Sequence, residues 1–202
     1  MRKLLAVAMV LCIPGIASAA SLVQNGSFED PTQASGTWDI YPSIPGWTSG
    51  SLGIEVRNNV VGTASAGSNF VELDTTANSF MSQSIATQSG QRYTLSFDYS
   101  PRIDQPAATN GIGVQWNGNT LATFTANGGS SNFWATFTFI VTGAGTDVLR
   151  FFASGTSDSL GGNIDNVSLA AVPLPGAAIL FGSVLLGAGV VRSRMTRSAL
   201  PA

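Results

Sequence analysis

Carboxylates, amides, hydroxyls and aromatic rings make up the chemical inventory of this 202-residue sequence between residues 20 and 172. The chain contains no His, its single Cys is Cys12, and residues 20–172 contain no Lys. These absences exclude His-dependent acid–base catalysis, Cys nucleophiles, disulfides and zinc sites with His or Cys ligands from this interior. They also exclude Schiff bases and lysine-containing phosphate loops. The remaining groups suit calcium and sugars far better than acyl or phosphoryl transfer.

The distribution of charge excludes a nucleic-acid-binding protein. All 11 acidic residues lie in the interior, with only four of the nine basic residues, Arg57, Arg92, Arg102 and Arg150. Four positive and 11 negative side chains give the interior a formal net charge of −7, whereas the whole chain carries −2. A body with this charge offers no positive surface to a phosphate backbone.

Paired carboxylates are the one catalytic arrangement that the interior still offers. Glycosidases need two carboxyl groups several ångströms apart, one protonated and one ionised. The candidates are Glu55, Glu72, Asp74 and Asp98. Glu72 and Asp98 fall on the polar positions of alternating strands, where we expect charges to be solvated. Their spacing does not demand catalysis, and a carbohydrate-active hydrolase or lyase is kept as an alternative.

Apolar and polar residues alternate in short runs, as at 93–99, 112–116 and 137–141. A period of two is typical of half-buried antiparallel strands, and no stretch shows a helical period over three turns. Further strands are predicted at 54–57, 70–73, 81–85, 121–125, 148–153 and 164–169. Asn117-Gly118 predicts a tight hairpin because both residues tolerate positive φ. The sequence therefore predicts a single all-β domain over residues 20–172, a jelly-roll β-sandwich.

The first 19 residues have the pattern of a secretory signal peptide. Arg2 and Lys3 give a positive start, residues 4–16 form a short apolar stretch, and Ala17-Ser18-Ala19 provides a small-residue cleavage site. The apolar stretch is too short to span a membrane. We therefore expect export through the inner membrane and removal of residues 1–19.

Residues 172–202 combine a proline motif, an apolar run and a basic end. The motif is Val172-Pro173-Leu174-Pro175, whose prolines break regular structure after the domain. The uncharged run over about 176–191 is long enough to cross a bilayer. Arg192 and Arg194 follow at once, within a basic end at 192–197, which predicts a cytoplasmic C-terminus.

This arrangement over residues 173–202 closely resembles the PEP-CTERM sorting tail of Gram-negative bacteria. The resemblance implies that a membrane protease of the exosortase type cleaves near the proline motif and passes the protein to the cell surface. Leu174 departs from the Glu of the family pattern, so the residues leave open which sorting enzyme acts. A plain C-terminal anchor in the inner membrane is the alternative.

Four short motifs in the interior occur in a characteristic order. They are Asn25-Gly26-Ser27-Phe28-Glu29, Ile44-Pro45-Gly46-Trp47, Phe70-Val71-Glu72-Leu73-Asp74 and Ile164-Asp165-Asn166-Val167. Together they resemble the galactose-binding-like jelly rolls of bacterial carbohydrate-binding modules and of plant cell-wall proteins with the same opening motif. The resemblance implies a structural calcium where the first and last strands meet, held by Glu29, Asp165 and backbone carbonyls. The alternative is that both residues are ordinary carboxylates at the rim.

Aromatic side chains are the candidates for contact with a sugar, since rings can stack on pyranose faces. Trp38 and Tyr41 lie in a loop-rich segment, 35–45, and loops carry function disproportionately. Packing is the alternative for both. We expect Trp47 and Trp116 to be buried, and Phe133 rather than Trp134 to be the buried residue at the start of its strand.

These features predict a secreted, surface-sorted, non-catalytic protein that binds or helps to build extracellular polysaccharide. Its expected location after processing is the cell surface or the extracellular matrix. Its expected partners are an exosortase-type protease, the polysaccharide and, before processing, the inner membrane. A purely structural surface protein without a defined ligand is a further alternative, beside the carbohydrate-active enzyme.

Overall fold

The computed structural model describes residues 20–173, which fold into twelve antiparallel strands with no helix among them. The first five strands are short, and the last seven form the body of the domain. Their bounds are β1 Thr37–Tyr41, β2 Ser43–Ile44, β3 Trp47–Ser49, β4 Ile54–Asn58, β5 Asn69–Glu72, β6 Phe80–Ala86, β7 Arg92–Ser100, β8 Ile112–Trp116, β9 Asn119–Phe124, β10 Ala135–Thr142, β11 Thr146–Ala153 and β12 Asn163–Ala171.

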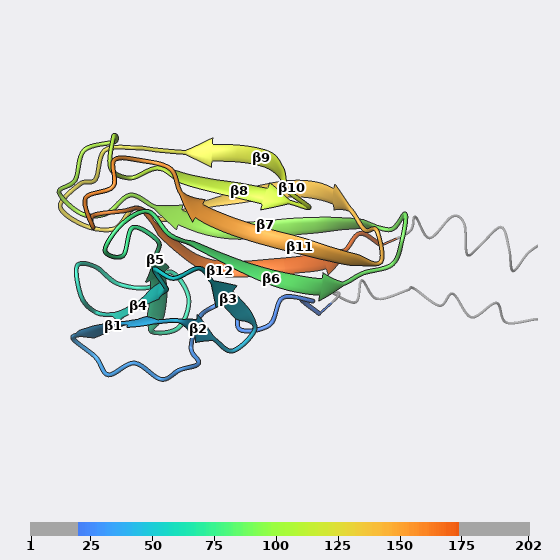
Figure 1. Ribbon diagram of the computed structural model, residues 1–202, viewed down its shortest axis with the longest axis horizontal. Coiled ribbons are helices and arrows are strands. Elements are labelled where there is room, and N and C mark those ends of the chain that lie inside the picture. Colours follow the sequence, from blue (N-terminus) through green and yellow to red (C-terminus); the bar gives the residue numbers. More distant parts are fainter. Residues whose placement is uncertain (1–19, 174–202) are drawn as a thin grey trace, which may run out of the picture.

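The strands form two six-stranded antiparallel sheets that pack face to face (Figure 1). The first sheet has the order β1-β4-β5-β12-β7-β10 and is called sheet A. The second, sheet B, has the order β2-β3-β6-β11-β8-β9. The predicted all-β sandwich is confirmed, and Asn117 and Gly118, both at positive φ, form the expected two-residue hairpin between β8 and β9.

The core lies between the sheets and follows the alternation of the sequence. Leu95 and Phe97 of β7 and Leu149 and Phe151 of β11 are fully buried. Phe97 has four aromatic neighbours, and its ring centroid lies 4.9 Å from that of Phe151. Trp47 and Trp116 are buried, as predicted.

Two of the sequence motifs pack on each other, which explains their occurrence together. The Asn25 side chain binds the backbone of Asp30 and donates to the Pro45 carbonyl, while the Trp47 indole donates to the Asn25 carbonyl. The segment around Gly26 also runs beside β12, because Val167 N donates to the Gly26 carbonyl at 2.8 Å. The opening and closing motifs therefore meet in the fold.

One segment differs from the prediction. The sequence predicts a loop-rich segment at 35–45, but this segment contains β1 and β2, and Trp38 and Tyr41 lie on the edge strand β1. The pattern there is weak because β1 is mostly exposed and pairs only with β4.

The two ends of the described chain lie at one end of the sandwich, near Ala20 and Pro173 (Figure 1). The loops 101–111, 125–134 and 154–162 lie at the opposite end, which is called the loop end. Val172 continues from β12 and donates to the Arg92 carbonyl.

The signal peptide, residues 1–19, lies outside the described residues, as do Leu174, Pro175, the run at 176–191, Arg192 and Arg194. Within residues 20–173, no helix has the length and apolar character needed to cross a membrane.

Candidate functional site

An aromatic groove of about 590 Å³ lies at the loop end, between the edge strands β9 and β10. These strands are the last members of sheets B and A, so the sandwich is open between them. The lining combines aromatic rings with small and polar residues, namely Tyr99, Pro101, Thr123, Phe124, Thr125, Ala126, Asn127, Gly129, Phe133, Ala135 and Phe137.

The rings of the groove differ in exposure from floor to rim. Phe124 and Phe137 are partly buried, with ring centroids 4.1 Å apart, and Phe124 packs edge-on against the core residue Phe97. Phe133 stands at the rim and is 75% exposed. The two inner rings are held by packing, and the outer ring is exposed. Together they form an aromatic surface on which a ring-shaped ligand can stack.

Asn110 joins the two loops that border the groove. Its side-chain amide donates to the carbonyls of Gln105, Pro106 and Ala126, and its Oδ1 accepts from Arg102 N. Tyr99 donates its hydroxyl to the Asn110 carbonyl at 2.8 Å. Since Asn110 is fully buried, these bonds fix loop 101–111 against the start of loop 125–134.

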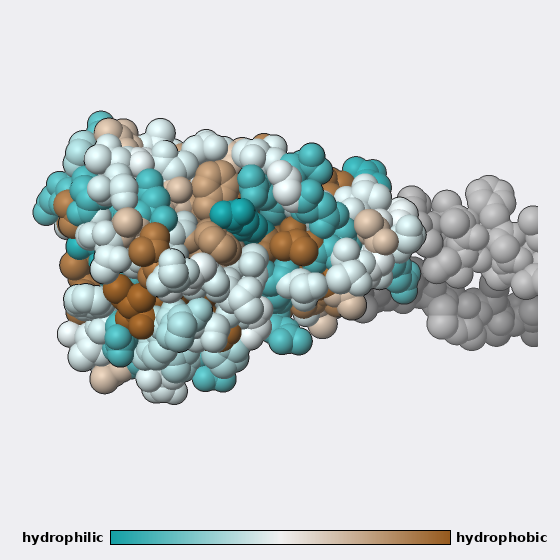
Figure 2. Space-filling view, viewed as in Figure 1, coloured by the Kyte–Doolittle hydropathy of each residue, from teal (hydrophilic) through white to brown (hydrophobic). Residues whose placement is uncertain are grey.

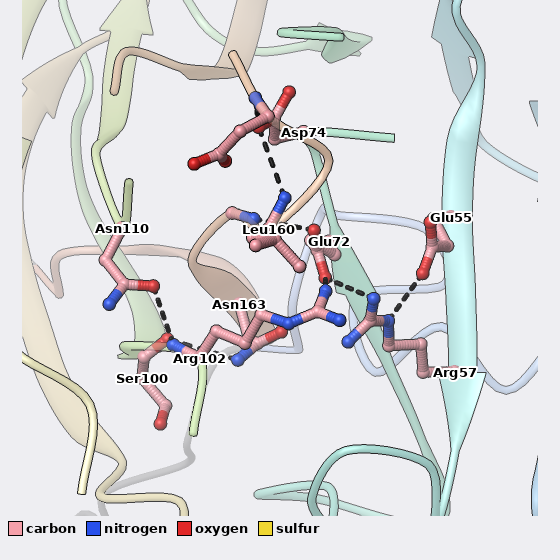
Figure 3. Close-up of polar contacts among 11 residues, drawn as sticks. Glu55, Arg57, Glu72, Asp74, Ser100, Arg102, Asn110, Leu160 and Asn163 are labelled. Carbon is pink, nitrogen blue, oxygen red and sulfur yellow. Dashed lines mark hydrogen bonds and ion pairs between the residues drawn. The ribbon is translucent and has the colours of Figure 1, made fainter. Parts of the chain in front are cut away.

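A buried ion network holds the other side of loop 101–111 (Figure 3). Glu72 of β5 accepts from Arg57 at 2.5 Å and from Arg102, and Arg57 also binds Glu55 at 2.6 Å. Glu72, Arg57 and Glu55 are at most 5% exposed in their side chains, and Arg102 is 12% exposed. Arg102 is the member that comes from a loop, so the network ties loop 101–111 to the sheet.

Glu72, together with Asp74, also holds loop 154–162. The second oxygen of Glu72 accepts from Gly161 N at 2.7 Å, and Asp74 Oδ2 accepts from Asp158 N and Leu160 N. Figure 3 shows both arginines reaching Glu72 from the same side, with Leu160 next to Glu72 and Asp74 beyond Leu160. Two loops of the loop end are therefore braced by one buried polar cluster.

The burial of these carboxylates corrects one sequence expectation. Glu72 and Asp98 were expected to be solvated, but Glu72 is fully buried and Asp98 is 4% exposed. The alternation is right, but loops cover this outer face of sheet A: Ser65 of loop 59–68 donates to Asp98, and Arg102 binds Glu72. Burial raises the pKa of Glu72 to about 7, against the opposing effect of Arg57 and Arg102.

None of the four candidate catalytic carboxylates lines the groove. Glu55, Glu72, Asp74 and Asp98 are all at most 4% exposed and are bound to arginines, backbone amides or hydroxyls. This arrangement gives them a role in positioning loops.

Glu29 and Asp165 hold one and the same segment, residues 65–69. Glu29 Oε1 accepts from Ser68 N and Asn69 N, both at 2.8 Å, and Asp165 Oδ2 accepts from Ser65 N and Ala66 N. Asp165 is fully buried, and this burial raises its pKa to about 7. The fold thus brings the two predicted calcium ligands to opposite ends of a five-residue segment.

The oxygen atoms around this segment are of the kind that bind a calcium ion. Asn69 Oδ1 is buried there without a hydrogen-bond partner, in the residue whose backbone N donates to Glu29. Residues 20–173 contain no group of three or more His, Cys, Asp or Glu side chains suited to a metal. A calcium ion would therefore need amide or carbonyl oxygens beside Glu29 and Asp165, as calcium sites in proteins commonly use.

Trp38 and Tyr41 are not brought together. Trp38 is 53% exposed and lies opposite Arg57 in the β1–β4 pair. Tyr41, three positions along the strand, points to the other face, packs against the core and donates its hydroxyl to Gln33. Neither residue lines the groove.

The groove residues escaped the sequence reasoning for two reasons. Phe137 begins the alternating run 137–141, a pattern that predicts an inward-facing residue of a half-buried strand, but it is only partly buried and lines the groove. The prediction that Phe133 is the buried residue at the strand start is wrong, since Phe133 is the most exposed aromatic residue within 20–173. The sequence does contain a signal for the exposure of Phe133. This residue directly follows a run of Gly, Ser and Asn at 127–132, which is typical of a loop.

No protein-family model matches the chain. Among curated proteins it is similar to the multifunctional-autoprocessing repeats-in-toxin proteins of two Vibrio species. It is 30% identical over 155 residues to that of Vibrio vulnificus and 28% identical over 151 residues to that of Vibrio cholerae. Each match covers 74% of this chain, but the chain spans only 3% of the length of either toxin.

Two solved structures share the fold of the domain. One is TmCBM61 in complex with β-1,4-galactotriose, with a TM-score of 0.51 and 18% identity, over 75% of this chain and 99% of that one. The other is the K1 cleaved adhesin domain of Lys-gingipain from Porphyromonas gingivalis W83, with a TM-score of 0.50 and 16% identity, over 68% of this chain and 98% of that one. The domain therefore has the β-sandwich fold of carbohydrate-binding modules and of this adhesin domain.

Proposed function

We propose that the protein is a non-catalytic polysaccharide-binding protein and that the sugar chain lies in the aromatic groove. The observation that carries this proposal is the set of rings Phe124, Phe133 and Phe137 at an open edge of the sandwich. Their partly exposed faces suit the C–H surface of a pyranose. Thr123, Asn127 and the backbone of loop 125–134 offer polar groups for its hydroxyls.

Three further observations support the proposal. The groove is open between two edge strands, which suits a chain rather than a single small molecule. Its loops are fixed in place by buried bonds, so little ordering cost accompanies binding. The fold is shared with a carbohydrate-binding module that was solved with β-1,4-galactotriose, which supports a sugar ligand for this scaffold.

The proposed location is the cell surface or the extracellular matrix, reached through the signal peptide and the PEP-CTERM-like tail. The ends of the described chain lie opposite the groove (Figure 1), so a tether at Pro173 would leave the groove facing outward. In a host with the matching exosortase, intact-mass measurement of the surface form should show loss of the residues beyond the proline motif. A mature protein that retains residues 192–202 would contradict processing and favour a plain anchor.

Glu29 and Asp165, with the amide oxygen of Asn69, would hold the proposed structural calcium, which supplies charge neutralisation when bound. The residues themselves already fix segment 65–69 between the opening motif and β12. The ion would thus strengthen the existing attachment of segment 65–69 and would not contact the bound sugar.

The test is a glycan array probed with the full-length protein, purified in mild detergent, and with three single variants. Phe133→Ala removes the exposed ring of the groove. Trp38→Ala removes the ring that the sequence favoured. Ile140→Ala, on β10 and 50% exposed, is a matched control outside the groove.

We expect binding to neutral oligosaccharides that Phe133→Ala abolishes and the other two variants retain. Loss with Trp38→Ala alone would move the site to the edge strand β1. A wild-type protein that binds no glycan would contradict the proposal and favour a structural surface protein.

A further inference from the structure

The outer face of sheet B carries an arginine without an acidic partner. Arg150 lies in the middle of β11, opposite Ser82 of β6 and Gln115 of β8. No carboxylate among residues 20–173 forms an ion pair with it, and its Nε is buried without a hydrogen-bond partner. Figure 2 shows this face, on which strongly hydrophilic and apolar side chains lie next to each other near the middle.

Two aromatic rings flank this arginine. The Arg150 guanidinium lies over Phe80, with Cζ 4.0 Å from the ring centroid, and 5.8 Å from the centroid of Phe152. Both distances are within the range of cation–π attraction, which fixes a long side chain that would otherwise move freely. Both rings are partly exposed.

Glycines make room for these rings. The far edge of the Phe152 ring lies over Gly113 of β8, where any Cβ would overlap it, and the Phe80 ring lies against Gly50 in the same way. A glycine inside a strand weakens that strand and marks a close approach. Gly113 therefore weakens β8, but it makes the room that allows the Phe152 ring to lie close to the sheet.

We propose that this face, Phe80, Arg150 and Phe152 with Ser82 and Gln115, is a second binding surface, specific for a uronic acid residue of a polysaccharide. The planar guanidinium matches a carboxylate through two parallel N–H donors. A pyranose ring beside that carboxylate can lie on the exposed part of Phe152, while the Ser82 hydroxyl and the Gln115 amide are placed for its hydroxyls. The proposal assumes the polysaccharide ligand of the proposed function but uses none of the groove residues.

Charge complementarity favours this ligand. Residues 20–172 carry a net charge of −7, and of the four arginines Arg57 and Arg102 are occupied by Glu55 and Glu72. An acidic sugar chain is therefore repelled by most of the domain and attracted where Arg150 lies. Two arginines among residues 20–173 form no ion pair, and of these Arg150 lies over aromatic rings, whereas Arg92 is exposed at the start of β7, outside this face.

The experiment is calorimetric titration of the full-length protein, in mild detergent, with trigalacturonate and with its fully methyl-esterified form. The variants are Arg150→Met, which removes the charge, and Arg150→Lys, which keeps the charge but removes the planar donor pair. Arg92→Met is the matched control, because Arg92 is exposed and lies outside this face. Phe133→Ala separates this face from the groove.

We expect the wild type to bind trigalacturonate and the methyl ester at least tenfold more weakly. Arg150→Met should lose at least tenfold in affinity, Arg150→Lys should lose part of this, and Arg92→Met and Phe133→Ala should bind like the wild type. The inference would be overturned by unchanged affinity in Arg150→Met or by no binding of the wild type. Loss in Phe133→Ala with retention in Arg150→Met would also overturn it, while supporting the groove as the sugar site.

Discussion

Replacing Arg102 by Met should destabilise the domain in a pH-dependent manner. Arg102 is 12% exposed and binds Glu72, which is fully buried. After the substitution Arg57 is the only cation that still binds Glu72. The buried negative charge of Glu72 is then less well compensated, which destabilises the folded state. Removing one partner of a buried ion pair costs about 3–5 kcal/mol. Because Arg57 still binds Glu72, we expect the lower end, about 3 kcal/mol, when Glu72 is ionised.

The pH dependence follows from the raised pKa of Glu72. Burial raises this pKa to about 7, so Glu72 is ionised at pH 8.5 and protonated at pH 5.5. At pH 5.5 Arg102 supplies only a hydrogen bond to a neutral acid, worth about 1 kcal/mol. Arg102→Met should therefore cost about 3 kcal/mol at pH 8.5 and about 1 kcal/mol at pH 5.5.

Urea denaturation followed by tryptophan fluorescence measures both values. Arg92→Met is the control, since Arg92 is exposed, and it should change the free energy of unfolding by less than about 0.5 kcal/mol. The double variant Arg102→Met with Glu72→Gln should be more stable than the sum of the single changes, by about 1–3 kcal/mol, as expected of groups in contact. An effect of Arg102→Met at pH 8.5 no larger than that of Arg92→Met would refute the bracing role of the network.

Three other measurements test further parts of the account. Phe97→Ala should lower the free energy of unfolding by about 3–5 kcal/mol in urea titrations, because Phe97 is fully buried among four rings; a loss under about 1 kcal/mol would place it outside the core. The raised pKa of Glu72 stabilises the fold fully below its unfolded value of 4.5, and this stability is lost as the pH rises through about 7, by about 3 kcal/mol in all. Thermal melting at pH 5 and pH 8 should show a larger loss in the wild type than in Glu72→Gln, which keeps the loss caused by Asp165, whose pKa is also raised to about 7; equal losses in the two proteins would contradict the assignment. Chelation should lower the melting temperature, calcium should restore it better than magnesium, and Asp165→Ala should abolish the response; identical wild-type melting in chelator and in millimolar calcium would reduce Glu29 and Asp165 to hydrogen-bonding partners of segment 65–69.

The sheets could be predicted from the sequence because their side chains alternate. Leu95, Phe97, Leu149 and Phe151 are buried at the positions that a period of two requires. The Asn117-Gly118 hairpin is local, since two residues with positive φ determine it. Such features depend on neighbours in the sequence, so one chain contains enough information for them.

The candidate site could not be predicted in the same way, because it depends on which loops cover which face. Alternation places Glu72 and Asp98 on the outer face of sheet A, but only the folded loops at 59–68, 101–111 and 154–162 bury them. Phe133 is exposed and Phe137 partly buried because the sandwich is open between β9 and β10, which follows from the order of strands in both sheets. Long-range packing therefore determines the groove, while local pattern determines the strands.

The most direct test of the central proposal is an NMR titration of ¹⁵N-labelled residues 20–172 with the neutral oligosaccharide that binds best on the array. If the sugar lies in the aromatic groove, the largest shifts should fall on 123–129 and 133–137, and Phe133→Ala should remove them while the remaining spectrum stays folded. Shifts centred on Trp38 and β1, or on β6, β11 and β8, with the groove signals unchanged, would contradict this placement of the neutral sugar.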